Sequence, residues 1–307
     1  MKLFVSGLVN VETDLKIRSF PVTYYPVDYP FFGINSTVSG VGYNISTAAH
    51  TLGDEVTFAS MIGKDAESKR IKETLDRAGF DCSLVSDSLE TSPVSIVLYE
   101  QGNNGRRQIY CDLKDIQDRT LDAELVRGAI EAADACVLCN INFNRALLPL
   151  AKQAGKLIAT DVHVLSDIFD PFNRDFMKYA DILFLSDEDL PMAPRDFLLA
   201  LKTEYPAKII VIGLGSDGAI MYDRETDTIT QMPAAALGGV VNTVGAGDAL
   251  FASFIHYYGK CGAVEALKRA QIFAALKIRH DGGAAGFSTE EQVDNVYGTY
   301  EFKWQTE

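Results

Sequence analysis

The chain contains 307 residues, of which 47% are hydrophobic and 23% are charged, so it can bury a full core and is not a disordered, collagen-like or mucin-like chain. Its 28 basic and 42 acidic residues give a formal net charge of −14, and no basic run is longer than Arg106-Arg107. A nucleic-acid backbone is therefore not an expected partner. A phosphorylated or nucleotide ligand stays possible, because backbone N–H groups at helix starts bind anions without net positive charge.

The cysteine content and the N-terminus predict a reduced, cytoplasmic protein. The five cysteines are odd in number and scattered. The sequence begins MKLFVSGLVN, without the charged and apolar regions of a secretion signal. No stretch approaches eighteen consecutive apolar residues, so neither a transmembrane helix nor a membrane partner is expected.

The first third of the chain has the two-residue alternation of strands. Residues 2–6 form a short apolar run, and residues 12–18 alternate charged and apolar side chains, which predicts a half-exposed strand. Residues 95–113 predict a hairpin, because the Gly-Asn-Asn-Gly sequence at 102–105 tolerates the backbone angles of a tight turn. Together with residues 11–38, this hairpin is expected to form a small separate sheet.

From residue 44 onward, helical segments alternate with short apolar strands. Strands of this kind between helices predict a parallel sheet that is covered on both faces. The expected helices span residues 45–52, 66–78, 123–132, 146–154, 176–179, about 197–203, 246–258 and 263–279. The expected strands span residues 56–61, 135–138, 157–160, 182–185 and 209–212, followed by a hairpin around 218–231.

Residues 213–218 contain Gly-x-Gly-x-x-Gly directly after a predicted strand, a pattern typical of dinucleotide-binding proteins. The residues after Gly218 lack the amphipathic stripe of a helix, which that pattern needs in order to direct a helix N-terminus at a pyrophosphate. We therefore interpret the segment as strand, turn and strand, with the glycines serving the turn.

The segment Asn242-Thr-Val-Gly-Ala-Gly-Asp248 precedes apolar residues at helical spacing from Leu250 to Ile255, so a helix begins within Gly-Ala-Gly-Asp. Small residues there let a ligand approach the unpaired N–H groups, which bind a phosphoryl group together with the helix dipole. Asp248 is either an ordinary helix cap or a base that takes the proton of an attacking hydroxyl. The second interpretation describes a kinase site.

A third cluster, Ser39-Gly-Val-Gly-Tyr-Asn44, precedes the first predicted helix. Its glycines and its amide suit the close approach of a polyhydroxylated ligand, although a loop with a helix cap would have the same composition. No Gly-Lys-Ser or Gly-Lys-Thr sequence occurs, so the chain is not a P-loop enzyme.

Two motifs in this order make the sequence resemble the ribokinase-like (PfkB) family of carbohydrate and nucleoside kinases over essentially the whole chain. The first is Ser39-Gly-Val-Gly-Tyr-Asn-Ile-Ser46, followed by Gly53 and Gly63. The second is Asn242–Asp248, which is similar to the family's catalytic Asp-Thr-x-Gly-Ala-Gly-Asp.

The resemblance implies a single α/β domain over residues 1–307. Its fold would be a three-layer sandwich with a central, mostly parallel sheet and a small β-sheet lid from about residues 11–38 and 95–113. The implied activity is ATP-dependent transfer of the γ-phosphoryl group to a hydroxymethyl group of a sugar or sugar derivative, with Mg²⁺ bridging the phosphates. Closure of the lid would exclude water, which would otherwise hydrolyse ATP.

The resemblance also implies roles for individual residues. Asp248 would be the general base, and the amides of Gly245, Ala246 and Gly247 would form the anion hole. Substrate-binding positions would be Asn10, Glu12, Gly40, Gly42, Asn44 and Asn142. ATP would lie against Ser186, Asp189, Gly215 and Gly218, and Asp189 would also hold Mg²⁺ through water.

Several positions depart from the family's pattern. Glu12 replaces an Asp that holds sugar hydroxyls, and Ser186-Asp-Glu-Asp189 replaces an Asn-x-x-Glu sequence. Asn242 replaces an Asp near a monovalent-cation site, so dependence on potassium stays open. Val41 stands where ribokinases carry a Lys, which argues against a plain ribokinase.

The sequence leaves the acceptor open. Local runs also resemble pseudouridine kinases, so a nucleoside kinase is one alternative to a sugar kinase. The altered positions 186, 189 and 242 allow a second alternative, which is a non-catalytic ligand-binding protein with the same fold. The exposed edge of the lid sheet would allow a homodimer.

Overall fold

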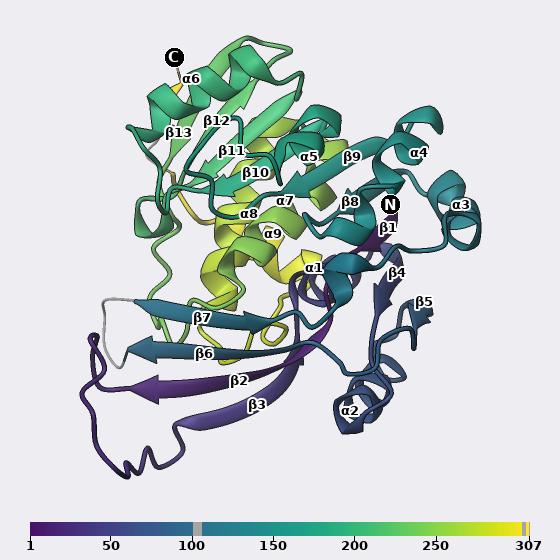
Figure 1. The fold of residues 1–307 in the computed structure, drawn as a ribbon. Coiled ribbons are helices and arrows are strands. Elements are labelled where there is room, and N and C mark those ends of the chain that lie inside the picture. Colours follow the sequence, from purple (N-terminus) through teal and green to yellow (C-terminus); the bar gives the residue numbers. More distant parts are fainter. Residues whose placement is uncertain (101–105, 303–304, 307) are drawn as a thin grey trace.

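Two β-sheets organise the chain in the computed structural model, which describes residues 1–100, 106–302 and 305–306 (Figure 1). The strands of the larger sheet are β1 (Lys2–Ser6), β4 (Glu55–Met61), β5 (Asp81–Ser86), β8 (Ala135–Leu138), β9 (Leu157–Asp161), β10 (Ile182–Ser186), β11 (Ile209–Gly213), β12 (Ala219–Asp223), β13 (Thr228–Met232) and β14 (Gln305–Thr306). Their spatial order is β14-β13-β12-β11-β10-β9-β8-β1-β4-β5. Neighbouring strands from β5 to β11 run parallel and β12 to β14 are antiparallel, so the predicted mostly parallel sheet is confirmed.

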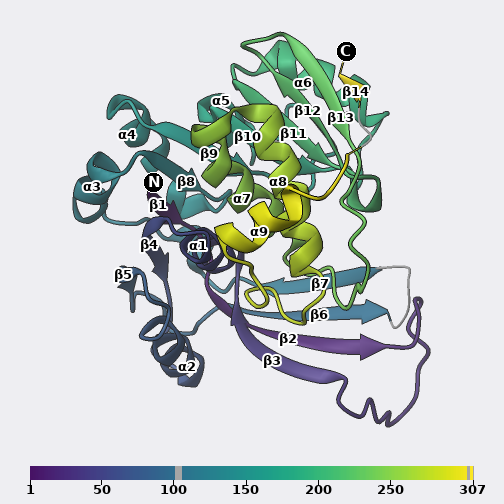
Figure 2. The same cartoon turned by 180° about the vertical axis from the view of Figure 1, so that it is seen from behind.

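Helices cover both faces of this sheet, which confirms the predicted three-layer sandwich (Figures 1 and 2). The helices whose buried side chains belong to one core cluster are α1 (Val41–Thr51), α2 (Ala66–Leu75), α7 (Ala246–Cys261), α8 (Ala263–Lys277) and α9 (Glu290–Tyr297). Those of the other cluster are α3 (Ala123–Ala132), α4 (Leu147–Gln153), α5 (Arg174–Tyr179) and α6 (Pro194–Glu204). None of the described helices combines the length and the apolar character needed to cross a bilayer.

The central strand β1 shows why two cores form. Leu3 and Val5 belong to one core cluster and Phe4 to the other, because successive side chains of a strand point to opposite faces. All three are at most 2% exposed. Burial of each such side chain contributes about 1.5–3 kcal/mol, so an apolar run without alternation is what a strand covered on both faces requires.

The smaller sheet contains four strands, β2 (Asn10–Ile17), β3 (Ile34–Ser39), β6 (Val94–Glu100) and β7 (Arg107–Asp112), in the order β3-β2-β6-β7. It lies below the larger sheet in Figure 1. β6 and β7 pair antiparallel, which confirms the two strands of the predicted hairpin, while the predicted turn at 102–105 lies outside the described residues.

Two local predictions were wrong, and two elements were missed. The strand expected to be half exposed buries Glu12 and Asp14, so its charged side faces inward. The first helix begins at Val41, since Gly40 caps it at φ 108°, and Gly42 and Asn44 are therefore helical residues and do not lie in a preceding loop. β5 and α9 were not predicted, because β5 is an edge strand with a mixed polar sequence and α9 is short.

Candidate active site

The candidate site lies at the carboxyl ends of the parallel strands, where open α/β sheets bind their ligands. β1 leads directly into the small sheet through residues 7–9, and α7 begins at the same edge. Three of the predicted residues, Asp248, Asn44 and Glu12, are buried there, and a hydrogen bond joins the first two. The Asn44 side chain donates from Nδ2 to Asp248 Oδ2 at 2.8 Å, and it accepts from Ser39 Oγ at 3.2 Å. The third, Glu12, acts on Asp248 electrostatically.

Asp248 is the third residue of α7 and is 8% exposed. Burial raises its pKa to about 6, and the charges of Asp161 and Glu12 act in the same direction. The hydrogen bond from Asn44 and the nearby His163 oppose this increase in pKa. A carboxylate of this pKa is ionised at neutral pH and is a better proton acceptor than an exposed aspartate, as a general base requires.

The predicted anion hole is the first turn of α7. Gly245 caps the helix at φ 77°, and a Cβ atom at this position would lie 2.5 Å from the carbonyl oxygen of Gly283. Around Gly247 no described atom would lie within 4 Å of an added Cβ, so a ligand has room to approach. The N–H of Ala246 already donates to Thr243 O at 3.1 Å, so this amide is engaged within the turn.

Asn10, Glu12 and Asp14 lie on one side of β2, because residues two apart in a strand share a face. They are 2%, 7% and 3% exposed. Ser95 Oγ links two of them, since it accepts from Asn10 Nδ2 at 3.0 Å and donates to Glu12 Oε2 at 3.2 Å. Within the described part of the chain, one side-chain oxygen of each of the three has no hydrogen-bond partner. Three buried acceptors in a row suit a ligand that carries several hydroxyl groups.

Asp14 was not predicted as a site residue, although the sequence shows that it continues the two-residue spacing of Asn10 and Glu12. Burial, together with the charges of Glu12 and Asp281, raises the pKa of Asp14 to about 7. The ordinary pKa is 3.8. Between these two values the folded chain holds a proton that the unfolded chain releases, so the free energy of unfolding falls as the pH rises through this range.

We expect Asp14→Asn to increase the free energy of unfolding at pH 8 by about 1–2 kcal/mol, because the variant does not bury a charge there. At pH 4 the two proteins should be equally stable, since the wild-type carboxyl is then protonated. Urea unfolding at both pH values measures the difference. Asp196→Asn, which changes an exposed aspartate of α6, serves as control, and a loss of stability in Asp14→Asn at pH 8 would contradict the assignment.

The two glycines of the first motif pack against the protein's own backbone. A Cβ atom at Gly40 would lie 2.6 Å from Leu8 O, and one at Gly42 would lie 2.6 Å from the carbonyl carbon of Gly7. This close approach seats the start of α1 on the end of β1 and thereby directs Asn44 at Asp248. Their predicted contact with substrate stays a prediction.

Asn142 lies in the short 3₁₀ helix η2 (Asn142–Asn144), where its side chain is engaged locally. Its Nδ2 donates to Gln117 O at 2.5 Å, and its Oδ1 accepts from Arg145 Nε at 3.1 Å. Among the described contacts, none joins this side chain to the cluster around Asp248. The role of Asn142 in substrate binding therefore stays a prediction.

The predicted nucleotide residues follow β10 and β11. Ser186 pairs in register with Gly213, so both strands end at the site edge. β11 and β12 are antiparallel around the 3₁₀ helix η3 (Gly215–Asp217), which confirms strand, turn and strand. Gly215 has open space around its Cα, whereas Gly218 packs against Met232 O. Asp189 is exposed.

Three more titratable residues interact electrostatically with Asp248, namely Asp161, His163 and Lys277, and the sequence analysis assigned none of them to the site. Asp161 ends β9 and accepts from the backbone N–H of His163 at 2.8 Å. Lys277 ends α8 and is fully buried. The position of Asp161 directly after an apolar strand was a usable signal. Nothing in the sequence around Lys277 distinguishes it from a surface lysine.

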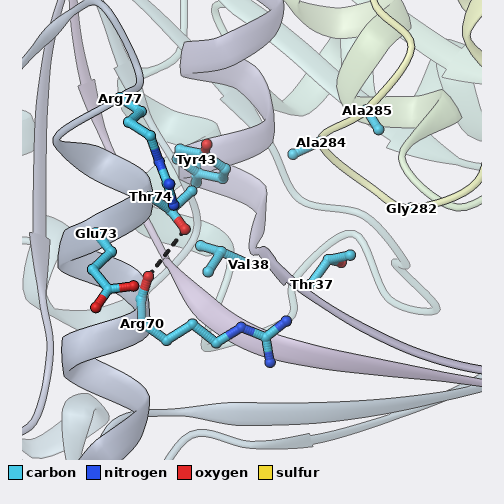
Figure 3. Close-up of a pocket in the computed structure, with 10 residues that line it drawn as sticks. All are labelled: Thr37, Val38, Tyr43, Arg70, Glu73, Thr74, Arg77, Gly282, Ala284 and Ala285. Carbon is cyan, nitrogen blue, oxygen red and sulfur yellow. Dashed lines mark hydrogen bonds between the residues drawn. The ribbon is translucent and has the colours of Figure 1, made fainter.

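A cavity of about 450 Å³ lies beside this cluster, between β3, α1, α2 and the loop 282–285 (Figure 3). None of Asp248, Glu12 and Asn44 lines it. The candidate active site is therefore defined by its buried polar side chains and by the start of α7. The lining residues of the cavity are Thr37, Val38, Tyr43, Arg70, Glu73, Thr74, Arg77, Gly282, Ala284 and Ala285.

A mostly parallel sheet, a small second sheet and a buried carboxylate at a glycine-rich helix start together define a class of phosphotransferases. The family model for pfkB family carbohydrate kinases matches residues 3–290. The chain belongs to this family, and it is a phosphotransferase with an alcohol group as acceptor.

Relatives and solved structures agree with this family. A deoxyribokinase of Salmonella typhi is 36% identical over 96% of this chain and 98% of its own. A microbiome-derived acarbose kinase has the same fold, with a TM-score of 0.85, 24% identity and coverage of 97% and 98% of the two chains. Arabidopsis thaliana ribokinase, solved with ribose and ATP, has a TM-score of 0.78 at 18% identity and covers 97% of this chain and 99% of its own.

Proposed function

We propose that the protein transfers the γ-phosphoryl group of ATP to a hydroxymethyl group of a sugar. The observation that carries this proposal is the buried Asp248, held by Asn44 at the start of α7 and beside the hydroxyl-binding residues of β2. A base, an anion site and a row of acceptors are the parts that phosphoryl transfer to an alcohol needs.

In this mechanism Asn10 and Glu12 accept hydrogen bonds from substrate hydroxyl groups and orient the acceptor. Asp248 Oδ takes the proton of the attacking hydroxyl, while the amide of Gly247 and the dipole of α7 stabilise charge on the transferred group. Asn44 keeps the carboxylate of Asp248 in position through its 2.8 Å hydrogen bond.

The nucleotide would lie along the ends of β10 and β11, with Gly215 as a position of close approach. The oxygen-rich side chains of Ser186 and Asp189 fit a hydrated Mg²⁺, which prefers carboxylate oxygens and retains much of its water. When bound, Mg²⁺ neutralises the charge of the phosphates. Ser186 and Asp189 would hold it through water.

The acceptor is best argued to be a pentose. The deoxyribokinase relative covers nearly the full length at 36% identity, which favours a small free sugar over a nucleoside or an oligosaccharide. The additional carboxylate of Asp14 supports an acceptor that presents hydroxyl groups along β2. A nucleoside acceptor remains an outcome of the test below.

The small sheet would act as the lid of a single domain, and a second copy of the chain would cover its outer face. On the face opposite Asp14, its strands leave Ile34, Ile96 and Tyr110 48–62% exposed. The segment between β2 and β3 adds Phe31 and Phe32, which are 84% and 106% exposed. An apolar surface of this kind marks an interaction site, and an exposed sheet edge is a template for pairing.

The proposed function predicts ATP-dependent phosphorylation of deoxyribose or ribose at the hydroxymethyl group. A coupled ADP-release assay with Mg²⁺ measures it across pentoses, hexoses, keto-deoxy sugar acids, uridine, pseudouridine, adenosine and inosine, and NMR of the product locates the phosphate. Turnover only with nucleosides would replace the sugar by a nucleoside. ATP binding without transfer to any acceptor would support a non-catalytic ligand-binding protein.

A further inference from the structure

Lys277 is the last residue of α8, and its side chain is 0% exposed. Its ammonium donates to the backbone carbonyl of Val244 and, at 2.9 Å, to that of Gly282. Neither of these partners is a carboxylate. Burial of a charged group is costly unless opposite charges and hydrogen bonds compensate it, so a fully buried lysine calls for an explanation.

The two carbonyls belong to the two loops that build the site. Val244 directly precedes Gly245, the cap of α7, and Gly282 belongs to the loop after α8. These loops are in close contact, since a Cβ atom at Gly245 would lie 2.5 Å from Gly283 O, and one at Gly283 would lie 2.5 Å from Ser39 Oγ. The ammonium therefore joins the anion-binding turn to the loop that packs on Ser39 and Asn44.

The charges around Lys277 favour a cation at this position. Asp248, Asp14, Glu12 and Asp281 all stabilise the protonated form of Lys277 electrostatically. Burial opposes them and lowers the pKa of Lys277 to about 8, which still leaves the side chain protonated at neutral pH. A fixed positive charge beneath the first turn of α7 also favours an anion above it.

Convergent backbone carbonyls are ligands that a monovalent metal ion accepts, and the resemblance to the family implies such an ion near position 242. The residues present do not fit one. The Lys277 ammonium already takes the carbonyl of Val244. Asn242 is neutral, its Oδ1 accepts from Val244 N–H at 2.9 Å, and its buried Nδ2 is a donor without a described partner.

We propose that the Lys277 ammonium is a built-in cation, which holds the loop before α7 to the loop after α8 in place of a bound monovalent ion. Lys277 is thus a positioning residue for the anion hole. This inference rests on the proposed kinase function for its activity readout. Catalysis should consequently be independent of potassium.

The first test compares wild-type turnover in potassium chloride and in tetramethylammonium chloride at equal ionic strength. The two rates should agree within about twofold, because the large tetramethylammonium ion cannot enter a site built from backbone carbonyls. Stimulation by potassium of about tenfold would overturn the proposal.

The second test removes the ammonium in two ways. Lys277→Met keeps most of the side-chain volume, and we expect kcat to fall by about tenfold or more in every salt. Lys277→Ala opens space beside the carbonyls, and part of its lost kcat should return with potassium or ammonium ions but not with tetramethylammonium. Lys178→Met, which changes an exposed lysine in the last turn of α5, is the matched control.

Thermal unfolding provides a readout that does not depend on activity. Potassium should raise the Tm of Lys277→Ala above its value in tetramethylammonium chloride, and it should not do so for the wild type. A folded Lys277→Ala that potassium neither stabilises nor reactivates would overturn the proposal. If the variants do not fold, the proposal is decided by the wild type alone, whose Tm and rate are compared between potassium chloride and tetramethylammonium chloride. Wild-type protein inactive with every acceptor would count against the proposed function, while the salt dependence of Tm still tests this inference.

Discussion

Asp248→Asn should lower kcat by about 10²- to 10⁴-fold and leave the fold intact. The variant keeps the shape of a side chain that is 8% exposed, but it removes the carboxylate that takes the proton of the attacking hydroxyl in the proposed mechanism. Its Tm at pH 8 should be equal to or above that of the wild type, because burial raises the pKa of Asp248 and a buried charge is thus removed. Steady-state kinetics and thermal unfolding measure both effects.

The matched control is Asp196→Asn, which changes an exposed aspartate at the corresponding third position of α6. Its kcat should be unchanged. In the wild type, kcat/KM should decrease as the pH falls below about 6, since the base must be ionised before it can accept a proton. Turnover of Asp248→Asn within a few-fold of the wild type would refute the assignment of the base.

Gly42→Ala should destabilise the protein by about 3 kcal/mol or more, although alanine is the better helix former. Gly42 lies in the first turn of α1, and an added Cβ would lie 2.6 Å from the backbone of Gly7 and 2.9 Å from the ring of Phe58. Backbone cannot move aside as a flexible side chain can, so α1 would shift and draw Asn44 away from Asp248. Urea unfolding and kcat should therefore both be affected.

Gly128→Ala is the control for this argument, because Gly128 also lies within a helix, the exposed side of α3. No described atom would lie within 4 Å of its added Cβ. The substitution then changes only the helix propensity, which is higher for alanine than for glycine. The variant should therefore be more stable than the wild type by about 0.5–1 kcal/mol. Equal effects at positions 42 and 128 would show that the contact with Gly7 does not constrain α1.

The layers of the fold could be predicted from the sequence because they depend on local periodicity. A strand such as β1, in which the consecutive residues Leu3, Phe4 and Val5 are all apolar, has to be covered on both faces. The start of α7 was predictable for the same reason, since a glycine-rich segment preceded residues at helical spacing. β5 lies at the sheet edge with a mixed sequence, so its pairing with β4 depends on tertiary contacts that no local pattern encodes.

Residues of the candidate site could be predicted where they belong to a recognisable sequence motif. They could not be predicted where a charged residue matters only because the fold buries it. Asp248 and Asn44 belong to glycine-rich motifs at helix starts. Asp14 and Lys277 are ordinary charged residues in sequence, on an alternating strand and near the end of a helix. Only the packing of the small sheet and of the loop 281–285 against the start of α7 buries them, and such long-range packing leaves no trace in the spacing of neighbouring residues.

The short connection between the two sheets has a mechanical consequence. Only residues 7–9 separate β1 from β2, and Gly40 alone separates β3 from α1. If the small sheet swings, it therefore turns about an axis close to these residues, and a point on it moves in proportion to its distance from that axis. Asn10 and Glu12, the proposed substrate residues, would lie beside the axis and keep their place, while the far end of β2, at Ile17, would travel furthest. A lid of this construction would bind the acceptor before closure and would seal the site with the opposite end of the same strand.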